Sequence, residues 1–156
     1  MRRLTLSISE PLAGRQVRTL LRRELGLSAA GVRRAKDQPD GILLDGQPVF
    51  TNVFVQPGQV LSVAVGDVTG SDQIAPVPGP LALCYEDEDL LIVNKPGDLA
   101  VHPSLGHHRD TLANFLMAHY EAQHLTAAFH PVNRLDRGTS GLMAVAKHAH
   151  AHELLQ

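Results

Sequence analysis

A segment rich in proline and glycine, GDVTGSDQIAPVPGP from Gly66 to Pro80, divides the sequence near its middle. It holds three prolines and three glycines, a composition that favours an extended connection over a packed helix or strand. The chain has 156 residues, of which 44% are apolar, enough for one ordinary domain or for one small and one partial domain. We therefore expect one module over residues 1–66, a linker over residues 67–80 and a second module over residues 81–156.

The two sides of this segment differ in charge. Residues 1–66 contain nine Lys+Arg and five Asp+Glu, a net charge of +4, whereas residues 67–156 contain five and eleven, a net charge of −6. Such an asymmetry indicates two modules with different partners, and the basic module is the candidate for binding a polyanion.

The basic module has a clear pattern of local structure. In GRQVRTLLRRELG, residues 14–26, apolar residues recur with helical spacing and arginines occupy the remaining surface. Ser28 is placed to cap a second short helix, SAAGVRRAKD. Two β-rich runs follow, and Asp45-Gly46 in the first favours a type I′ hairpin turn because both positions need φ > 0. The sequence predicts two basic helices followed by a small hairpin sheet.

This order of elements, over about residues 4–65, resembles a small RNA-binding module first described in a ribosomal small-subunit protein and found attached to many RNA-modifying enzymes. The resemblance implies contacts to RNA phosphates, which require only a cation or an N–H donor at the right height on the surface. An ordinary solvated helix surface is the alternative interpretation of the same charges. The residues expected to bind RNA are Arg22, Arg23, Arg33, Arg34 and Lys36.

The second module reads as a mainly antiparallel sheet with one long helix. The apolar runs LALCY and LLIVNK flank the acidic turn EDED and predict a hairpin, with Cys84 in its core. Asp110 is placed to cap the helix TLANFLMAHYEAQ, and LMAVAK predicts a further strand. We therefore expect an α+β fold, with a small N-terminal helix-helix-hairpin module and a partial, mainly antiparallel sheet domain.

Several classes of protein are disfavoured by the composition. No apolar run approaches the ~20 residues of a membrane span, and the N-terminus lacks the apolar core of a signal peptide, so we expect a cytoplasmic protein. The single cysteine allows neither an intrachain disulfide nor a cysteine-based zinc site. Nine histidines include His148 and His152 at helical spacing, but no HExxH pattern accompanies them, and we expect no metal site.

The stretch NRLDRGTSGL places one carboxylate, Asp136, between two guanidinium groups beside a turn. If the segment is extended, Arg134 and Asp136 project to one side while Leu135 anchors the other. A nearby guanidinium would lower the pKa of the carboxyl group, and an ionised aspartate suits the role of nucleophile or base. A structural ion pair that holds a surface turn is the alternative.

VNKPGDLAVHP followed by NRLDRGTSGLMAVAK resembles the paired signature of the RluA-type pseudouridine synthases, enzymes that isomerise uridine to pseudouridine within RNA. The resemblance covers about residues 81–156 and implies an isomerase that needs no cofactor and acts on ribosomal RNA or, alternatively, transfer RNA, as a monomer. It places the catalytic aspartate at Asp136. The positions that it assigns to substrate binding are Arg134, Arg137, Lys95, His102 and Thr139.

Two departures and the end of the chain bear on activity. This family usually has His where this chain has Asn133, and Asp98 adds a negative charge beside the Lys-Pro turn. The last residues, HAHAHELLQ, read as a helix without a termination signal, and members of the family continue further. We expect a truncated catalytic domain, and a non-catalytic RNA-binding fragment is the alternative function.

Overall fold

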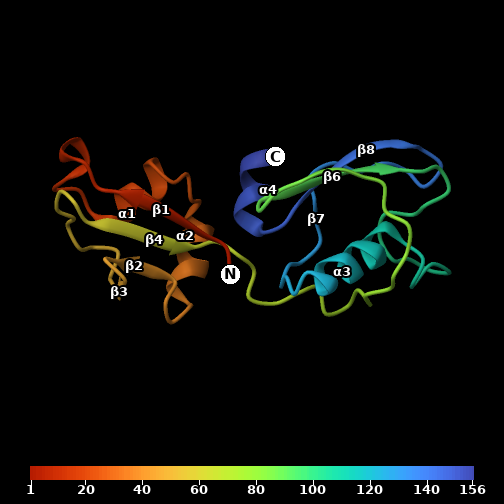
Figure 1. Ribbon diagram of the computed structural model, residues 1–156, viewed down its shortest axis with the longest axis horizontal. Helices are drawn as coiled ribbons and strands as arrows, with labels where there is room; N and C mark the ends of the chain where they lie inside the picture. Colours follow the sequence, from red (N-terminus) through yellow and green to blue (C-terminus); the bar gives the residue numbers. More distant parts are fainter. The chain divides into compact units, whose positions relative to one another are not determined.

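The computed structural model describes residues 1–156 and contains two compact units, Arg2–Val65 and Gly66–Gln156 (Figure 1). Each unit holds a four-stranded antiparallel sheet with helices packed against it. This arrangement confirms the expected α+β class. No helix in the chain has the length and apolar composition required to cross a membrane.

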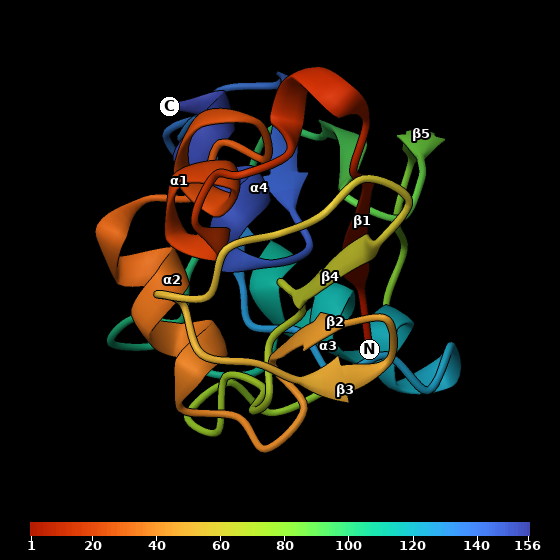
Figure 2. The same ribbon diagram turned by 90° about the vertical axis from the view of Figure 1, so that its left-hand side faces the viewer.

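The first unit is a sheet with the strand order β1-β4-β2-β3, covered by two helices (Figure 2). Its elements are β1 (Arg3–Ser7), the 3-10 helix η1 (Glu10–Leu12), α1 (Val17–Arg23), α2 (Ala29–Lys36), β2 (Ile42–Leu44), β3 (Gln47–Pro48) and β4 (Val60–Ala64). Buried residues of α1, such as Leu20 and Leu21, pack in one cluster with Leu61 and Val63 of β4.

Local signals in this unit predicted its turns correctly. The Ser28 hydroxyl accepts a 2.9 Å hydrogen bond from the Gly31 amide and caps α2 as expected. Asp45 and Gly46 have φ values of 51° and 77°, as a type I′ turn requires. The first strand, β1, was not predicted, because its few alternating apolar residues lie too near the N-terminus to give a strong pattern.

The second unit contains a sheet with the strand order β5-β6-β8-β7, and α3 packs against one face of it (Figure 1). The elements are β5 (Leu83–Glu86), β6 (Leu90–Lys95), α3 (Leu112–Ala122), β7 (His130–Pro131), β8 (Gly141–Ala146) and α4 (Ala149–Leu155). The central pair, β6 and β8, runs in continuous register from Leu90 opposite Ala146 to Lys95 opposite Gly141. The end of β6 therefore lies beside the start of β8.

Residues 67–80, expected to form an unpacked linker, contain no helix or strand but pack on the second unit. The side-chain nitrogen of Asn114 donates to the Ala75 carbonyl at 2.9 Å, and the backbone N–H of Val77 donates to the backbone carbonyl of Asn114 at 3.1 Å. A β-carbon at position 79 would clash with the Phe115 ring, so the chain passes directly over that ring at Gly79. The composition indicated an extended backbone but could not show that α3 offers it partners.

Two further expectations were wrong. The cap of α3 is Thr111, not Asp110: the Thr111 hydroxyl accepts from the Asn114 amide, and the Asn114 side chain accepts from the Thr111 amide at 3.1 Å. Asp110 instead pairs with His107 at 2.7 Å. Cys84 is exposed rather than in the core, because β5 is an edge strand whose register shifts between Leu83 and Tyr85.

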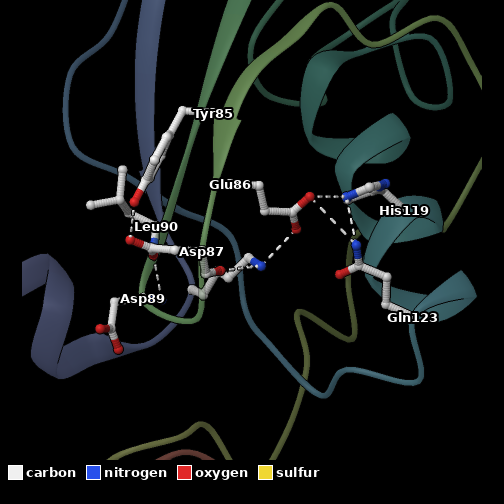
Figure 3. A network of polar contacts seen from close by, with 8 residues as sticks. Tyr85, Glu86, Asp87, Asp89, Leu90, His119 and Gln123 are labelled. Carbon is white, nitrogen blue, oxygen red and sulfur yellow. Dashed lines mark hydrogen bonds and ion pairs between the residues drawn. The ribbon is translucent and has the colours of Figure 1, made fainter.

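A partly buried carboxylate joins three elements of this unit (Figure 3). Glu86 at the end of β5 pairs with Lys147 after β8 at 2.6 Å and with His119 of α3 at 2.9 Å. Lys147 also donates to the Asp87 carbonyl at 2.6 Å. Burial raises the pKa of Glu86, but the bonds from Lys147 and His119 outweigh it and hold the pKa below its usual value.

Candidate active site

The loop between β7 and β8 presents Asp136 to solvent at the same end of the sheet as the turn that follows β6. The Asp136 carbonyl accepts a 3.0 Å hydrogen bond from the Thr139 amide and so forms a tight turn. Leu135 packs against the core, whereas the neighbouring side chains of Arg134 and Asp136 are exposed. This alternation matches the expected arrangement of the segment.

Asn133 attaches the start of this loop to β8. Its amide nitrogen donates to the Leu142 carbonyl at 3.2 Å, and its amide oxygen accepts from the Ala144 backbone at 2.8 Å. The two bonds imitate the pairing of a neighbouring strand. A side chain that looked like a departure from the family pattern therefore fixes the backbone three residues before the aspartate.

Lys95 attaches the other side of the Asp136 loop to the turn that follows β6. Its side chain is fully buried, and its ammonium donates to the carbonyls of Pro96 at 2.9 Å, Leu99 at 2.8 Å and Arg137 at 3.1 Å. Because an ammonium has three protons, these bonds use all of its donors. Lys95 therefore holds the two loops together. Substrate binding by this residue stays a prediction, and it would require the ammonium to give up one of these three hydrogen bonds.

The electrostatic surroundings of Lys95 reflect this position. Burial lowers the pKa of its ammonium, and the carboxylates of Asp98 and Asp136 act in the opposite direction by favouring the charged form. Asp98 adopts a left-handed backbone with φ of 67°, and its carbonyl accepts a 3.4 Å bond from the Arg137 guanidinium. The departure at Asp98 thus supplies a backbone contact to the same loop.

Other predicted substrate residues lie around this loop. His102 packs edge-on against Phe129 with ring centroids 4.9 Å apart, and burial followed by the charge of Arg134 lowers the pKa of its imidazole. Arg134, Arg137 and Thr139 expose their side chains. The Asp136 carboxylate forms no ion pair with either flanking arginine, so both guanidinium groups stay accessible to a polyanion.

The predicted RNA-binding residues lie on the helices of the first unit, and their side chains are exposed there. Arg22 and Arg23 line a cleft between α1 and α2 together with Arg18, which was not predicted. The spacing of Arg18 and Arg22, four residues apart on one helix, is the signal that could have found it. Arg33, Arg34 and Lys36 occupy the last turn of α2.

The two histidines that raised the possibility of a metal site, His148 and His152, make structural contacts. His148 caps α4 by accepting from the Ala151 amide at 3.2 Å and pairs with Asp89 at 3.0 Å, whereas His152 bonds the Pro131 carbonyl at 3.1 Å. No group of three histidine, cysteine or acidic side chains is arranged to hold a metal ion.

Taken together, the site offers one exposed carboxylate on a loop held at both sides, with two cations and an imidazole nearby. Residues 89–156 match the family model described as RNA pseudouridylate synthase. This segment is similar to RNA pseudouridine synthases. The matched residues include the whole Asp136 loop and its anchors on β6 and β8.

Individual relatives point to the same family. The chain is 41% identical over 117 residues to the uncharacterized RNA pseudouridine synthase YlyB of Bacillus subtilis, covering 73% of this chain and 38% of the relative. It is 35% identical over 132 residues to YjbO of the same organism, covering 85% and 47%.

A relative named ribosomal large subunit pseudouridine synthase D, from Neisseria meningitidis, is 32% identical over 147 residues, or 93% of this chain and 39% of the relative. The chain thus spans less than half the length of these relatives. A second relative with the same name, from Blochmanniella floridana, is 38% identical over 90 residues, or 57% of this chain and 28% of the relative.

Proposed function

We propose that this chain carries the catalytic aspartate, Asp136, of an RNA pseudouridine synthase of the RluA type that acts on ribosomal RNA. The observation that carries the proposal is the fixation of the Asp136 loop by Lys95 on one side and Asn133 on the other, within the segment that matches the family model. A group that must act on one atom of a bound nucleotide needs such preorganisation.

The reaction requires no external reactant. The bond from uracil N1 to C1′ of the sugar breaks, the base rotates, C5 bonds to C1′, and the proton on C5 leaves while N1 gains one. An ionised Asp136 serves this isomerisation by attack at C1′ or C6 or by abstraction of a proton from C2′. Arg134 and Arg137, which are both exposed, would bind the phosphates that flank the target nucleotide.

The first unit would recruit the RNA. We propose that Arg22, Arg23, Arg33, Arg34 and Lys36 contact phosphates and that their binding energy offsets the cost of unstacking the target base, on the order of a few kcal/mol.

A second candidate function is RNA binding without turnover. The exposed cations on the two helices of the first unit favour it, because they can bind RNA independently of the Asp136 loop. Transfer RNA is the alternative substrate class.

Release of tritium from RNA labelled at C5 of uridine tests the proposal, because joining C5 to C1′ expels that hydrogen. The chain is assayed alone and fused to the part of YjbO that follows the matched region. We expect the fusion to release tritium and the fusion with Asp136→Asn to bind the RNA equally well without release. Release by the Asp136→Asn fusion would refute the assignment of Asp136. If the chain alone and the unsubstituted fusion both bind RNA and neither releases tritium, the second candidate function is favoured.

A further inference from the structure

Two aromatic rings of the first unit stand in solvent on the segment between β3 and β4. Phe50 is 81% exposed and Phe54 is 64% exposed, whereas Phe129 of the second unit is 8% exposed. Single exposed apolar residues are common, but two large rings on one short segment of a small basic unit are not explained by its core.

This segment is held rigidly by α1. The carbonyl of Thr51 accepts from the Arg18 amide and that of Val53 accepts from the Val17 amide, each at 2.9 Å. Both donors belong to the first turn of α1, whose amides have no partner within the helix. The backbone next to Phe50 is thus fixed, and burying the ring would require these two hydrogen bonds to break.

Phe50 borders a cleft of 360 Å³ between the end of α2 and the chain that leaves β3. Ile42, Pro39 and Pro48 contribute apolar walls, and Lys36 stands among the lining residues. The volume falls in the range of small-molecule sites, roughly 300–1,000 Å³. A flat apolar wall with a cation beside it suits a planar group attached to an anion.

Positive charge continues along α2, in a second cleft. The cleft between α1 and α2 is also 360 Å³ and is lined by Arg18, Arg22 and Arg23. The two clefts contact neighbouring turns of α2, at Val32 and at Ala35. The unit carries nine Lys+Arg against five Asp+Glu. An acidic chain that follows α2 from one cleft to the other would meet cations in both and an exposed aromatic ring in one.

We propose that the Phe50 cleft is a binding site for an unpaired nucleobase of single-stranded RNA, with the base stacked on the Phe50 ring and the adjoining phosphate on Lys36. This inference rests on the proposed RNA-binding function of the first unit and adds a base contact to it. Stacking on an aromatic ring accepts any base, since every base has a π-face, so the site would give affinity for unpaired RNA without sequence choice. Duplex RNA cannot use it, because its bases are already stacked.

Fluorescence can detect the stacking directly, because the chain contains no tryptophan. Phe50→Trp places one indole in the cleft, and Phe54→Trp places one on the same segment outside the residues that line it. Each variant is titrated, as the 156-residue chain, with a single-stranded oligouridylate of about 12 nucleotides, within typical site sizes. We expect strong quenching of the indole in the Phe50→Trp variant and little change in the Phe54→Trp variant. Quenching that is equal in the two variants, or that is matched by duplex RNA, would overturn the proposal.

Affinity provides the second arm. Phe50→Ala should weaken binding to the single strand roughly tenfold or more, as loss of one base–aromatic stack does, while Phe54→Ala changes it less than twofold. The salt dependence should stay as in the wild type for Phe50→Ala and become less steep for Arg22→Gln by about 0.7 in log–log slope. If Arg22→Gln weakens binding and Phe50→Ala does not, the base site is refuted and RNA binding stands. If the wild type binds no RNA, both fall.

Discussion

The ammonium of Lys95 donates a 3.1 Å hydrogen bond to the carbonyl of Arg137, the residue that follows Asp136, across 42 positions of sequence. The same ammonium bonds Pro96 and Leu99, so one buried cation fastens the turn after β6 to the loop before β8. Because every atom involved except the ammonium belongs to the backbone, one side chain attaches the Asp136 loop to the turn after β6, while Asn133 attaches it to β8.

We therefore expect Lys95→Met to destabilise the second unit by about 3 kcal/mol, since it removes three hydrogen bonds, each worth about 0.5–1.5 kcal/mol. Urea unfolding followed by tyrosine fluorescence measures this, because both tyrosines, Tyr85 and Tyr120, lie in the second unit. Lys36→Met, at an exposed lysine, is the control and should shift the midpoint little. Equal effects of the two changes would contradict the role of Lys95.

Lys95 also shows what the sequence could and could not predict. The caps and turns at Ser28 and Asp45-Gly46 were predicted correctly because their signals involve residues a few positions apart. The Arg137 carbonyl, which Lys95 bonds, lies in a loop 42 positions further along the chain. The burial of the Lys95 side chain depends on the pairing of β6 with β8, which no local pattern encodes. For the same reason the Asp136 loop could be located in the sequence, but its anchors could not be assigned.

The position of a strand at the edge of its sheet was also not predicted from the sequence. Cys84 has apolar neighbours, which predicts a core position, yet β5 forms the edge of the sheet and turns that side chain to solvent. Whether an apolar run is central or at an edge depends on its number of paired neighbours. The contact of residues 67–80 with α3 could not be predicted either. It depends on a hydrogen bond from the Asn114 side chain, and in the sequence Asn114 is an ordinary helix residue.

Asn133→Ala should loosen the start of the Asp136 loop. The change removes the bonds to the Leu142 carbonyl and the Ala144 amide, each worth about 0.5–1.5 kcal/mol. Amide hydrogen exchange at Ala144 measures this loss directly, and we expect its protection to fall while that of Val93 in β6 is retained. Asn133→His tests whether the residue common in this family can replace the asparagine. Unchanged protection at Ala144 in the alanine variant would show that the side chain is not an anchor.

Asp67 should stabilise the second unit in a pH-dependent way. Burial raises the pKa of its carboxyl, but bonds from His130 and from the Ala128 and Ala149 amides outweigh burial and lower the pKa below the ordinary value. A carboxyl with a lowered pKa in the folded state stabilises the fold above its unfolded pKa of about 3.9. That stabilisation is lost as pH falls through the folded-state pKa.

We therefore expect Asp67→Asn to lower the unfolding free energy by about 1–3 kcal/mol at neutral pH, and the difference from wild type to shrink as pH falls below about 4. Asp72→Asn, at an exposed carboxylate of the same segment, serves as the control and should change little at any pH. Urea midpoints measured at several pH values give both curves. A difference that stays constant into the acid range would show that Asp67 is not ionised in the fold.

The last prediction concerns Tyr120, whose hydroxyl is buried in the second unit without a hydrogen-bond partner in the protein. Burial, followed by the nearby carboxylates of Glu86 and Asp67, raises the pKa of the phenol far above its ordinary value. The folded chain therefore keeps this proton at a pH where the unfolded chain releases it, above about 10. Since the folded state then binds more protons, stability falls as pH rises in this range.

Tyr120→Phe removes both effects. At pH 8 we expect it to be as stable as the wild type or more stable by up to ~1–2 kcal/mol, because an unpaired buried hydroxyl is lost without leaving a cavity. Between pH 8 and pH 11 its advantage should grow, because only the wild type must keep a phenol neutral that its unfolded state ionises. Urea unfolding followed by circular dichroism at both pH values measures the two differences. A variant less stable than wild type at pH 8 would mean that the hydroxyl has a partner after all, and an advantage that does not grow with pH would mean that its pKa is not raised.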